Sequence, residues 1–144
     1  MHGNWKRIFW TGLVFLMGSA TVSAETIGLK VAGRYYEVEL AQHDAARDFA
    51  SRLPMTLTFE DFGDTERIAY LTSPLRLGES PMETTPKTGD FAYYVPWGNL
   101  AVFVKDFRTS PQLVPLGRFS AEALQAVRQS GEGPVEFFRL TRER

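Results

Sequence analysis

The segment 89–106 constrains the fold more than any other part of this 144-residue chain. It contains two apolar runs, at 91–95 and 100–104, separated by the sequence Pro-Trp-Gly-Asn at 96–99. Proline fixes φ and glycine permits a positive φ, so the four residues between the runs favour a tight turn. Two apolar runs joined by such a turn are typical of a β-hairpin, with Trp97 at the point where the chain reverses.

Residues 1–24 have the layout of a cleaved secretory signal. Lys6 and Arg7 precede an apolar stretch at 8–17, and the sequence ends in the small residues Val22-Ser23-Ala24. An apolar span of about ten residues is half of the roughly twenty that a helix needs to cross a bilayer, which argues against a permanent anchor. We therefore expect cleavage after Ala24, no stable membrane insertion afterwards, and a periplasmic or secreted protein.

Removal of the signal leaves residues 25–144, about 120 residues, enough for one domain with its own core. The whole chain has 16 basic and 17 acidic residues, and Lys6 and Arg7 leave with the signal, so the remainder carries 14 basic against 17 acidic, a formal charge of −3. This balance gives no reason to expect nucleic acid as a partner. The chain has no cysteine, which excludes disulfides, thiol catalysis and thiolate metal sites.

Alternation of apolar and polar residues predicts an N-terminal hairpin, with strands at 26–31 and 34–40 joined by Ala32-Gly33. An amphipathic helix is expected at 44–53, capped by Asp44 and ended by Pro54. Seven or so strands and two short helices predict a mostly-β barrel in a single domain. The remaining expected elements are strands at 55–59, 67–71 and 135–141, a long connection at 72–88, and a second helix capped by Ser120 and ended by Gly131.

Few residues after the signal support covalent chemistry. His43 is the only histidine there, without a Gly-x-Ser-x-Gly motif or a metal-spaced partner, so we expect a surface residue at the start of the first helix. Asp61, Asp64 and Glu66 could present carboxylates to a cation or form an acid–base pair, but an acidic turn around Gly63 is the simpler interpretation. Phosphate-binding glycine loops are absent from the sequence. We assign no catalytic residue, no metal ligand and no cofactor.

Aromatic residues concentrate in and just after the hairpin, at Tyr93, Tyr94, Trp97, Phe103 and Phe107. Alternation places them on both faces of the hairpin, and we expect Phe91 and Phe103 in the core. Tyr94 and Trp97 fit a core or a groove equally well. Together with Asn99, which offers an amide donor and acceptor, they are the candidate ligand-binding residues, with help from the connection at 72–88.

Several motifs, in this order along the chain, resemble those of the bacterial cyclophilin-like proteins. They are Leu53-Pro54, Gly89-Asp90 followed by Tyr93-Tyr94, the Pro-Trp-Gly-Asn sequence at 96–99, and Leu116-Gly117. The resemblance implies a cyclophilin-like closed β-barrel of eight strands capped by two helices. It also implies kinship with prolyl isomerases, which bind proline-containing peptides in a surface groove.

The catalytic motif of the isomerases is incomplete in this chain. Cyclophilins place an arginine in a Phe-x-Arg run upstream of Gln-x-Gly-Gly-Asp-Phe, whereas this chain keeps Gly89-Asp90-Phe91 and has no Phe-x-Arg run upstream of it. We therefore expect a non-catalytic or weakly active module that binds a proline-containing peptide or a small apolar ligand. The alternative is a peptidyl-prolyl isomerase that acts on periplasmic proteins, with Arg67 or Arg76 as its cation. A third possibility is that the aromatic face is an oligomer interface.

Overall fold

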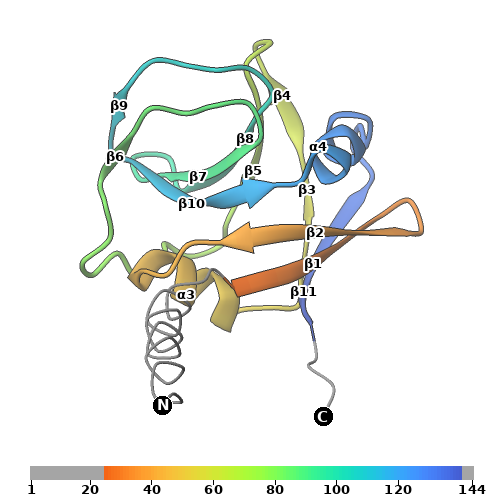
Figure 1. The fold of residues 1–144 in the computed structure, drawn as a ribbon, viewed down its shortest axis with the longest axis horizontal. Helices are drawn as coiled ribbons and strands as arrows, with labels where there is room; N and C mark the ends of the chain where they lie inside the picture. Colours follow the sequence, from red (N-terminus) through yellow and green to blue (C-terminus); the bar gives the residue numbers. More distant parts are fainter. Residues whose placement is uncertain (1–24, 141–144) are drawn as a thin grey trace, which may run out of the picture.

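The computed structural model describes residues 25–140, which form a barrel of strands with two short helices (Figure 1). The predicted signal at 1–24 lies outside the described residues. Within 25–140, no helix is long and apolar enough to cross a membrane. The strands are β1 (Glu25–Val31), β2 (Arg34–Leu40), β3 (Met55–Thr58), β4 (Glu60–Phe62), β5 (Glu66–Tyr70), β6 (Glu83–Thr84), β7 (Asp90–Tyr94), β8 (Asn99–Phe103), β9 (Ser110–Pro111), β10 (Leu113–Phe119) and β11 (Pro134–Arg139), and the helices are α3 (Asp44–Ser51) and α4 (Ala121–Arg128).

One sheet contains nine of these strands, in the order β3-β11-β1-β2-β10-β7-β8-β5-β4. Its two end strands, β3 and β4, are consecutive in the chain and only Phe59 separates them. Since β3 pairs with β11 and β4 pairs with β5, the segment 55–62 joins both ends of the sheet and nearly closes the barrel. This confirms the predicted mostly-β barrel. The strand number is higher than predicted because short strands such as β4, β6 and β9 are too brief to show alternation.

The main core lies inside the barrel and is rich in phenylalanine. The rings of Phe49 and Phe137 meet edge to face with centroids 5.4 Å apart, and Phe91 stacks on Phe137 at 5.8 Å. Phe49 comes from α3, while Phe91 and Phe137 come from β7 and β11. The helix therefore anchors the barrel interior with one large side chain, and the prediction that Phe91 is a core residue is confirmed.

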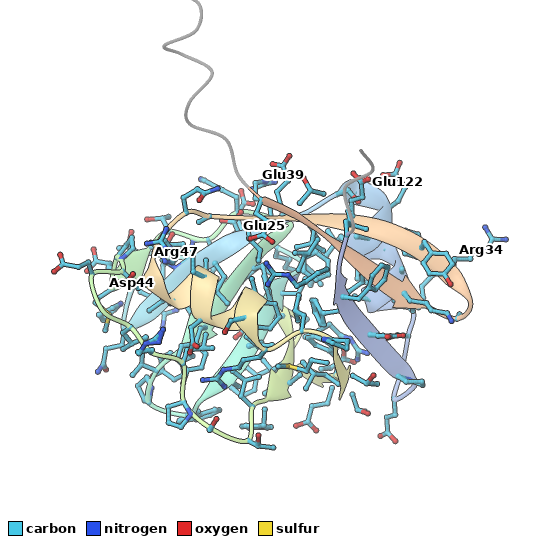
Figure 2. All side chains as sticks on the ribbon, turned by 90° about the horizontal axis from the view of Figure 1, so that it is seen from below. Glu25, Arg34, Glu39, Asp44, Arg47 and Glu122 are labelled. Carbon is cyan, nitrogen blue, oxygen red and sulfur yellow. The ribbon has the colours of Figure 1, made fainter. Side chains whose placement is uncertain are left out.

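The start of α3 differs from the prediction. His43, and not Asp44, is the N-cap: its Nδ1 accepts a hydrogen bond from the Ala46 N–H at 3.4 Å, and its Nε2 lies 2.6 Å from the carbonyl oxygen of Pro115. His43 is thus half-buried and fixed between α3 and β10. The Asp44 carboxylate instead pairs with Arg47, 3.1 Å away on the same helix (Figure 2), which leaves the imidazole as the group that caps the backbone.

The second helix begins as predicted but ends earlier. The Ser120 hydroxyl accepts a hydrogen bond from the Ala123 N–H at 3.1 Å, which confirms it as the N-cap. The helix ends at Arg128 with Gln129 as its C-cap. Gly131 instead adopts a positive φ of 56° in the turn that follows, so the glycine belongs to the connection to β11.

Strand β8 is buried on both of its faces, and this arrangement positions the candidate site. Leu100 and Val102 belong to the main core, whereas Ala101 and Phe103 belong to a second apolar cluster on the outer face of the sheet. Because side chains alternate along a strand, Asn99 shares the outer face with these last two residues. Phe103 is therefore buried as predicted, but beneath a loop and outside the main core.

The loop over this second cluster runs from β8 through β9 to β10 (teal in Figure 1). The connection 72–88 holds it in place: the Phe107 N–H donates to the Pro86 carbonyl at 3.0 Å, and the Gln112 N–H donates to the Met82 carbonyl at 2.8 Å. Strands β6 and β9 add a short antiparallel pair between the same two segments. The loop is thus tied down at several points along its length.

Candidate ligand-binding site

A cavity of about 350 Å³ lies between the outer face of the sheet and this loop. Strands β5, β8 and β10 form its floor. The hairpin turn at 95–98, strand β4 and the loop before β10 form its walls. The lining residues are mostly aromatic or apolar, with a few polar groups, which is the composition usual for a small-ligand site. They are Phe62, Glu66, Ile68, Tyr94, Trp97, Asn99, Phe103, Phe107, Arg108, Thr109, Ser110, Pro111, Gln112 and Leu113.

All three residues named from the sequence line this cavity. Trp97 is 53% exposed, so the groove and not the core is its environment. Its ring stands nearly perpendicular to the rings of Tyr94 and Phe62, at 72° and 81°, with centroids 5.8 and 5.6 Å away. The three rings form an aromatic corner at the mouth of the cavity. Phe62 was not expected there, because β4 is too short to show a pattern.

Asn99 is one of the polar residues of the floor. Only 2% of its surface is exposed, and its Nδ2 donates to the carbonyl oxygen of Leu100 at 3.1 Å. No hydrogen-bond donor among residues 25–140 reaches its buried Oδ1. A buried acceptor without a donor costs roughly 1–3 kcal/mol. Such a group in a cavity wall is what a site that receives a donor from a ligand would present.

Glu66 is a second acceptor in the cavity; from the sequence it was expected with Asp61 and Asp64, as a possible cation or acid–base group or, more simply, as part of an acidic turn. The register aligns Phe62, Glu66 and Phe103 across three neighbouring strands, so their side chains share the outer face. Burial raises the pKa of the Glu66 carboxyl, and no neighbouring cation offsets this effect. The alternation along β5 puts Glu66, Ile68 and Tyr70 on one face of the strand. This pattern is the feature of the sequence that could have placed Glu66 beside the apolar residues of that face.

Arg67 points to the opposite face from Glu66 and has a structural role. Its Nε donates to the Val127 carbonyl at 3.2 Å, and its two terminal nitrogens bond Asp61, Ser130 and the Gly131 carbonyl at 2.5 to 3.0 Å. Arg67 thus ties β4 and β5 to the end of α4. It does not line the cavity, so the role of an isomerase cation there does not fit it.

The other arginines differ in their relation to the cavity. Arg76 lies near α3, with its backbone N–H donating to Asp48 at 2.8 Å, and it does not line the cavity either. Arg108 does line it, and its guanidinium carbon sits 4.5 Å from the centroid of the Phe107 ring. Sequence reasoning missed Arg108 because nothing local shows that the loop folds back over β8.

The acidic turn itself is made of separate ion pairs. Asp61 binds Arg67 at 3.0 Å and Asp64 binds Lys105 at 2.8 Å, while Gly63 supplies the positive φ of the turn. No group of three or more His, Asp or Glu side chains able to hold a metal ion is found in the described part of the chain. The expected help from 72–88 is indirect, because that connection supports the loop and does not line the cavity.

Comparisons with known proteins agree with this architecture. The solution structure of the hypothetical protein AF2241 from Archaeoglobus fulgidus matches with a TM-score of 0.59 at 20% identity, covering 83% of this chain and 97% of that one. At this identity, the likeness shows the fold alone. No curated protein matches the chain significantly. The model of the Cyclophilin-like family matches residues 29–137, from the first strand of the barrel to the last, and the chain therefore belongs to the cyclophilin-like family.

Proposed function

We propose that this protein is an exported binding module that takes a proline-containing peptide or a small apolar ligand in the cavity beneath Trp97. The observation that carries the proposal is the buried Asn99 Oδ1, which has no donor among the described residues and lines a cavity with several aromatic walls. The aromatic corner of Phe62, Tyr94 and Trp97 supplies apolar contact area next to it. A ligand with an apolar body and one N–H or O–H donor would satisfy both features.

Binding is tested with a proline-containing peptide by calorimetry and with N-phenyl-1-naphthylamine, a neutral apolar fluorophore, by fluorescence. Trp97→Ala should weaken binding at least tenfold, since the indole forms one wall of the cavity. Tyr35→Ala is the matched control, because Tyr35 is also an exposed aromatic residue but lies outside this cavity. Equal binding by both variants would overturn the assignment of the site.

The same variants test the oligomer alternative. Sedimentation velocity over a hundredfold concentration range should show a single monomeric species. Its sedimentation coefficient should be the same for wild type and Trp97→Ala. A dimer that this substitution dissociates would mean that the aromatic corner is an interface between copies of the chain.

Arg108 is the observation that favours a second candidate function, a peptidyl-prolyl isomerase acting on periplasmic proteins. Isomerisation requires a cation or donor near the proline nitrogen to weaken amide resonance, and Arg108 is the arginine that lines the cavity. A protease-coupled assay on a proline peptide measures this activity. Turnover that Arg108→Ala abolishes and Arg76→Ala preserves would establish the enzyme, and absence of turnover would leave the binding module.

A further inference from the structure

We propose that the cavity selects an elongated cationic ligand, with a protonated amine at its Glu66 end, a short apolar stem, and an N–H donor at its Asn99 end. A lysine residue within a peptide has this chemistry, and so does an alkyl diamine. The inference rests on the proposed binding function and names the class of ligand that the site would take.

The first argument is the pair of acceptors. Glu66 and Asn99 both line the cavity, and neither the Glu66 carboxylate nor the Asn99 Oδ1 receives a hydrogen bond from the described residues. Buried or half-buried acceptors are normally paired, so two of them in one cavity indicate a ligand that donates at two points. Asn99 requires an N–H or O–H, which a quaternary ammonium group lacks.

The second argument is the distance between these acceptors. Glu66 lies opposite Phe103 in the register, and Asn99 precedes Phe103 by four residues on β8. At about 3.4 Å per strand residue, the Cα atoms of Glu66 and Asn99 are about 14 Å apart along the strands. The reach of the two side chains and a hydrogen bond of about 2.9 Å at each end change this span, but the two donors of the ligand must still lie several ångströms apart. A compact ligand with a single polar group cannot reach both.

The surface between the two acceptors is apolar. Ile68 and Ala101 are directly paired in the register midway between Glu66 and Asn99, and both belong to the buried cluster under the loop. A methylene stem would lie on this floor with the aromatic corner beside it. The four-carbon stem of lysine separates its ammonium from its own backbone N–H by several ångströms of apolar chain, which is the arrangement that two separated acceptors require.

The third argument is the sign of the charge. The half-buried Glu66 carboxylate would gain a partner from an ammonium group, and the nearby ring faces also favour a cation. Arg108 lines the same cavity but makes no ion pair with Glu66, since its guanidinium is stacked on Phe107. On the other side of Glu66, Arg67 is bound to Asp61 and Asp64 is bound to Lys105, which leaves Glu66 without a partner there too.

The test uses three probes of equal length and different charge: hexane-1,6-diamine, hexane-1,6-diol and adipate. Calorimetry on the purified protein measures the affinity of each probe for wild type, for Glu66→Gln and for the matched control Glu37→Gln, an exposed strand glutamate outside the cavity. Two tetrapeptides with blocked ends, one containing lysine and the other norleucine at the same position, are measured in the same way, each also with its sequence reversed. Their difference in affinity shows whether the amine can come from a peptide.

We expect the diamine to bind at least tenfold more tightly than the diol, Glu66→Gln to remove that difference, and Glu37→Gln to preserve it. A lysine peptide that binds tenfold better than its norleucine counterpart identifies a peptide as the source of the amine. Equal binding of diamine and diol, or tighter binding of adipate, would overturn the inference while leaving a ligand site in place. If neither these probes nor the apolar fluorophore bind, the proposed function fails as well.

Discussion

At the scale of single residues, Asn99 lies in surroundings that leave part of its side chain unpaired. Its neighbours on the same face, Ala101 and Phe103, are apolar, and only the nitrogen of its side-chain amide has a partner among the described residues. A leucine of similar size would fit the apolar surroundings without leaving a buried acceptor unpaired. The asparagine therefore carries a cost that its packing alone does not explain.

Asn99→Leu should raise the free energy of unfolding by about 1 kcal/mol, because the unpaired oxygen is removed and the volume is kept. The same variant should lose ligand affinity at least tenfold. Urea denaturation and calorimetry measure the two effects. A variant that loses stability and keeps affinity would show that the Asn99 amide serves the fold and not the site.

Glu66 makes the stability of the protein depend on pH. Burial raises the pKa of its carboxyl in the folded state, so the folded state holds the proton more tightly than the unfolded state. The stabilisation from protonated Glu66 is therefore complete below the unfolded pKa and is lost as the pH rises through the folded pKa.

Glu66→Gln should accordingly raise the Tm relative to wild type at pH 7, and the gain should shrink toward zero below about pH 4, near the ordinary pKa of a glutamate. Thermal denaturation from pH 3 to pH 8 measures the difference in Tm between wild type and variant. Glu37→Gln is the control, because it removes the same charge at an exposed position. A gain that is the same at every pH would contradict burial as its cause.

At the scale of elements, the contact between β2 and β10 depends on a glycine. Gly117 pairs with Leu40, and a Cβ on Gly117 would overlap the backbone carbonyl oxygen of Glu39. Backbone cannot move aside without separating the two strands. Gly28 is also crowded, but by the ring of Phe138, a half-buried side chain that can rotate.

Gly117→Ala should therefore destabilise the protein by about 2–3 kcal/mol, whereas Gly28→Ala should cost about 1 kcal/mol or less. Chemical denaturation of the two variants under identical conditions measures both values. The opposite order would mean that β2 shifts more easily than the Phe138 side chain.

At the scale of the whole molecule, closure of the barrel depends on the segment 55–62. This segment pairs with β11 through β3 and with β5 through β4, and Phe59 at the junction is fully buried. The strands on either side are short, so the packing of Phe59 in the core holds the bend between them.

Phe59→Ala should cost about 3–5 kcal/mol of stability, the range for deletion of a fully buried phenylalanine. Phe62→Ala, three residues later and 46% exposed, is the matched control and should cost much less. Urea unfolding monitored by circular dichroism gives both values. Similar losses would indicate that the aromatic corner, and not the junction, closes the barrel.

The proposal of export also concerns the whole chain. We propose that the signal is removed on secretion, so the intact mass of protein recovered from the periplasm or medium should correspond to a chain that begins at Glu25. Recovery of the full-length chain in the membrane fraction would contradict cleavage.

The sequence by itself determined the barrel class, the two helices and the residues of the hairpin turn, because these depend on local alternation, caps and turn chemistry. It also singled out Tyr94, Trp97 and Asn99, which lie in adjacent strands or in their connecting turn. Only the tertiary structure decided that Trp97 faces solvent and that the Arg67 guanidinium is hydrogen-bonded at the end of α4. Glu66 and Arg108 reach the same cavity from segments about forty residues apart, through strand register and a folded loop. Contacts of that kind depend on which strands pair, and pairing at long range leaves no mark in local sequence.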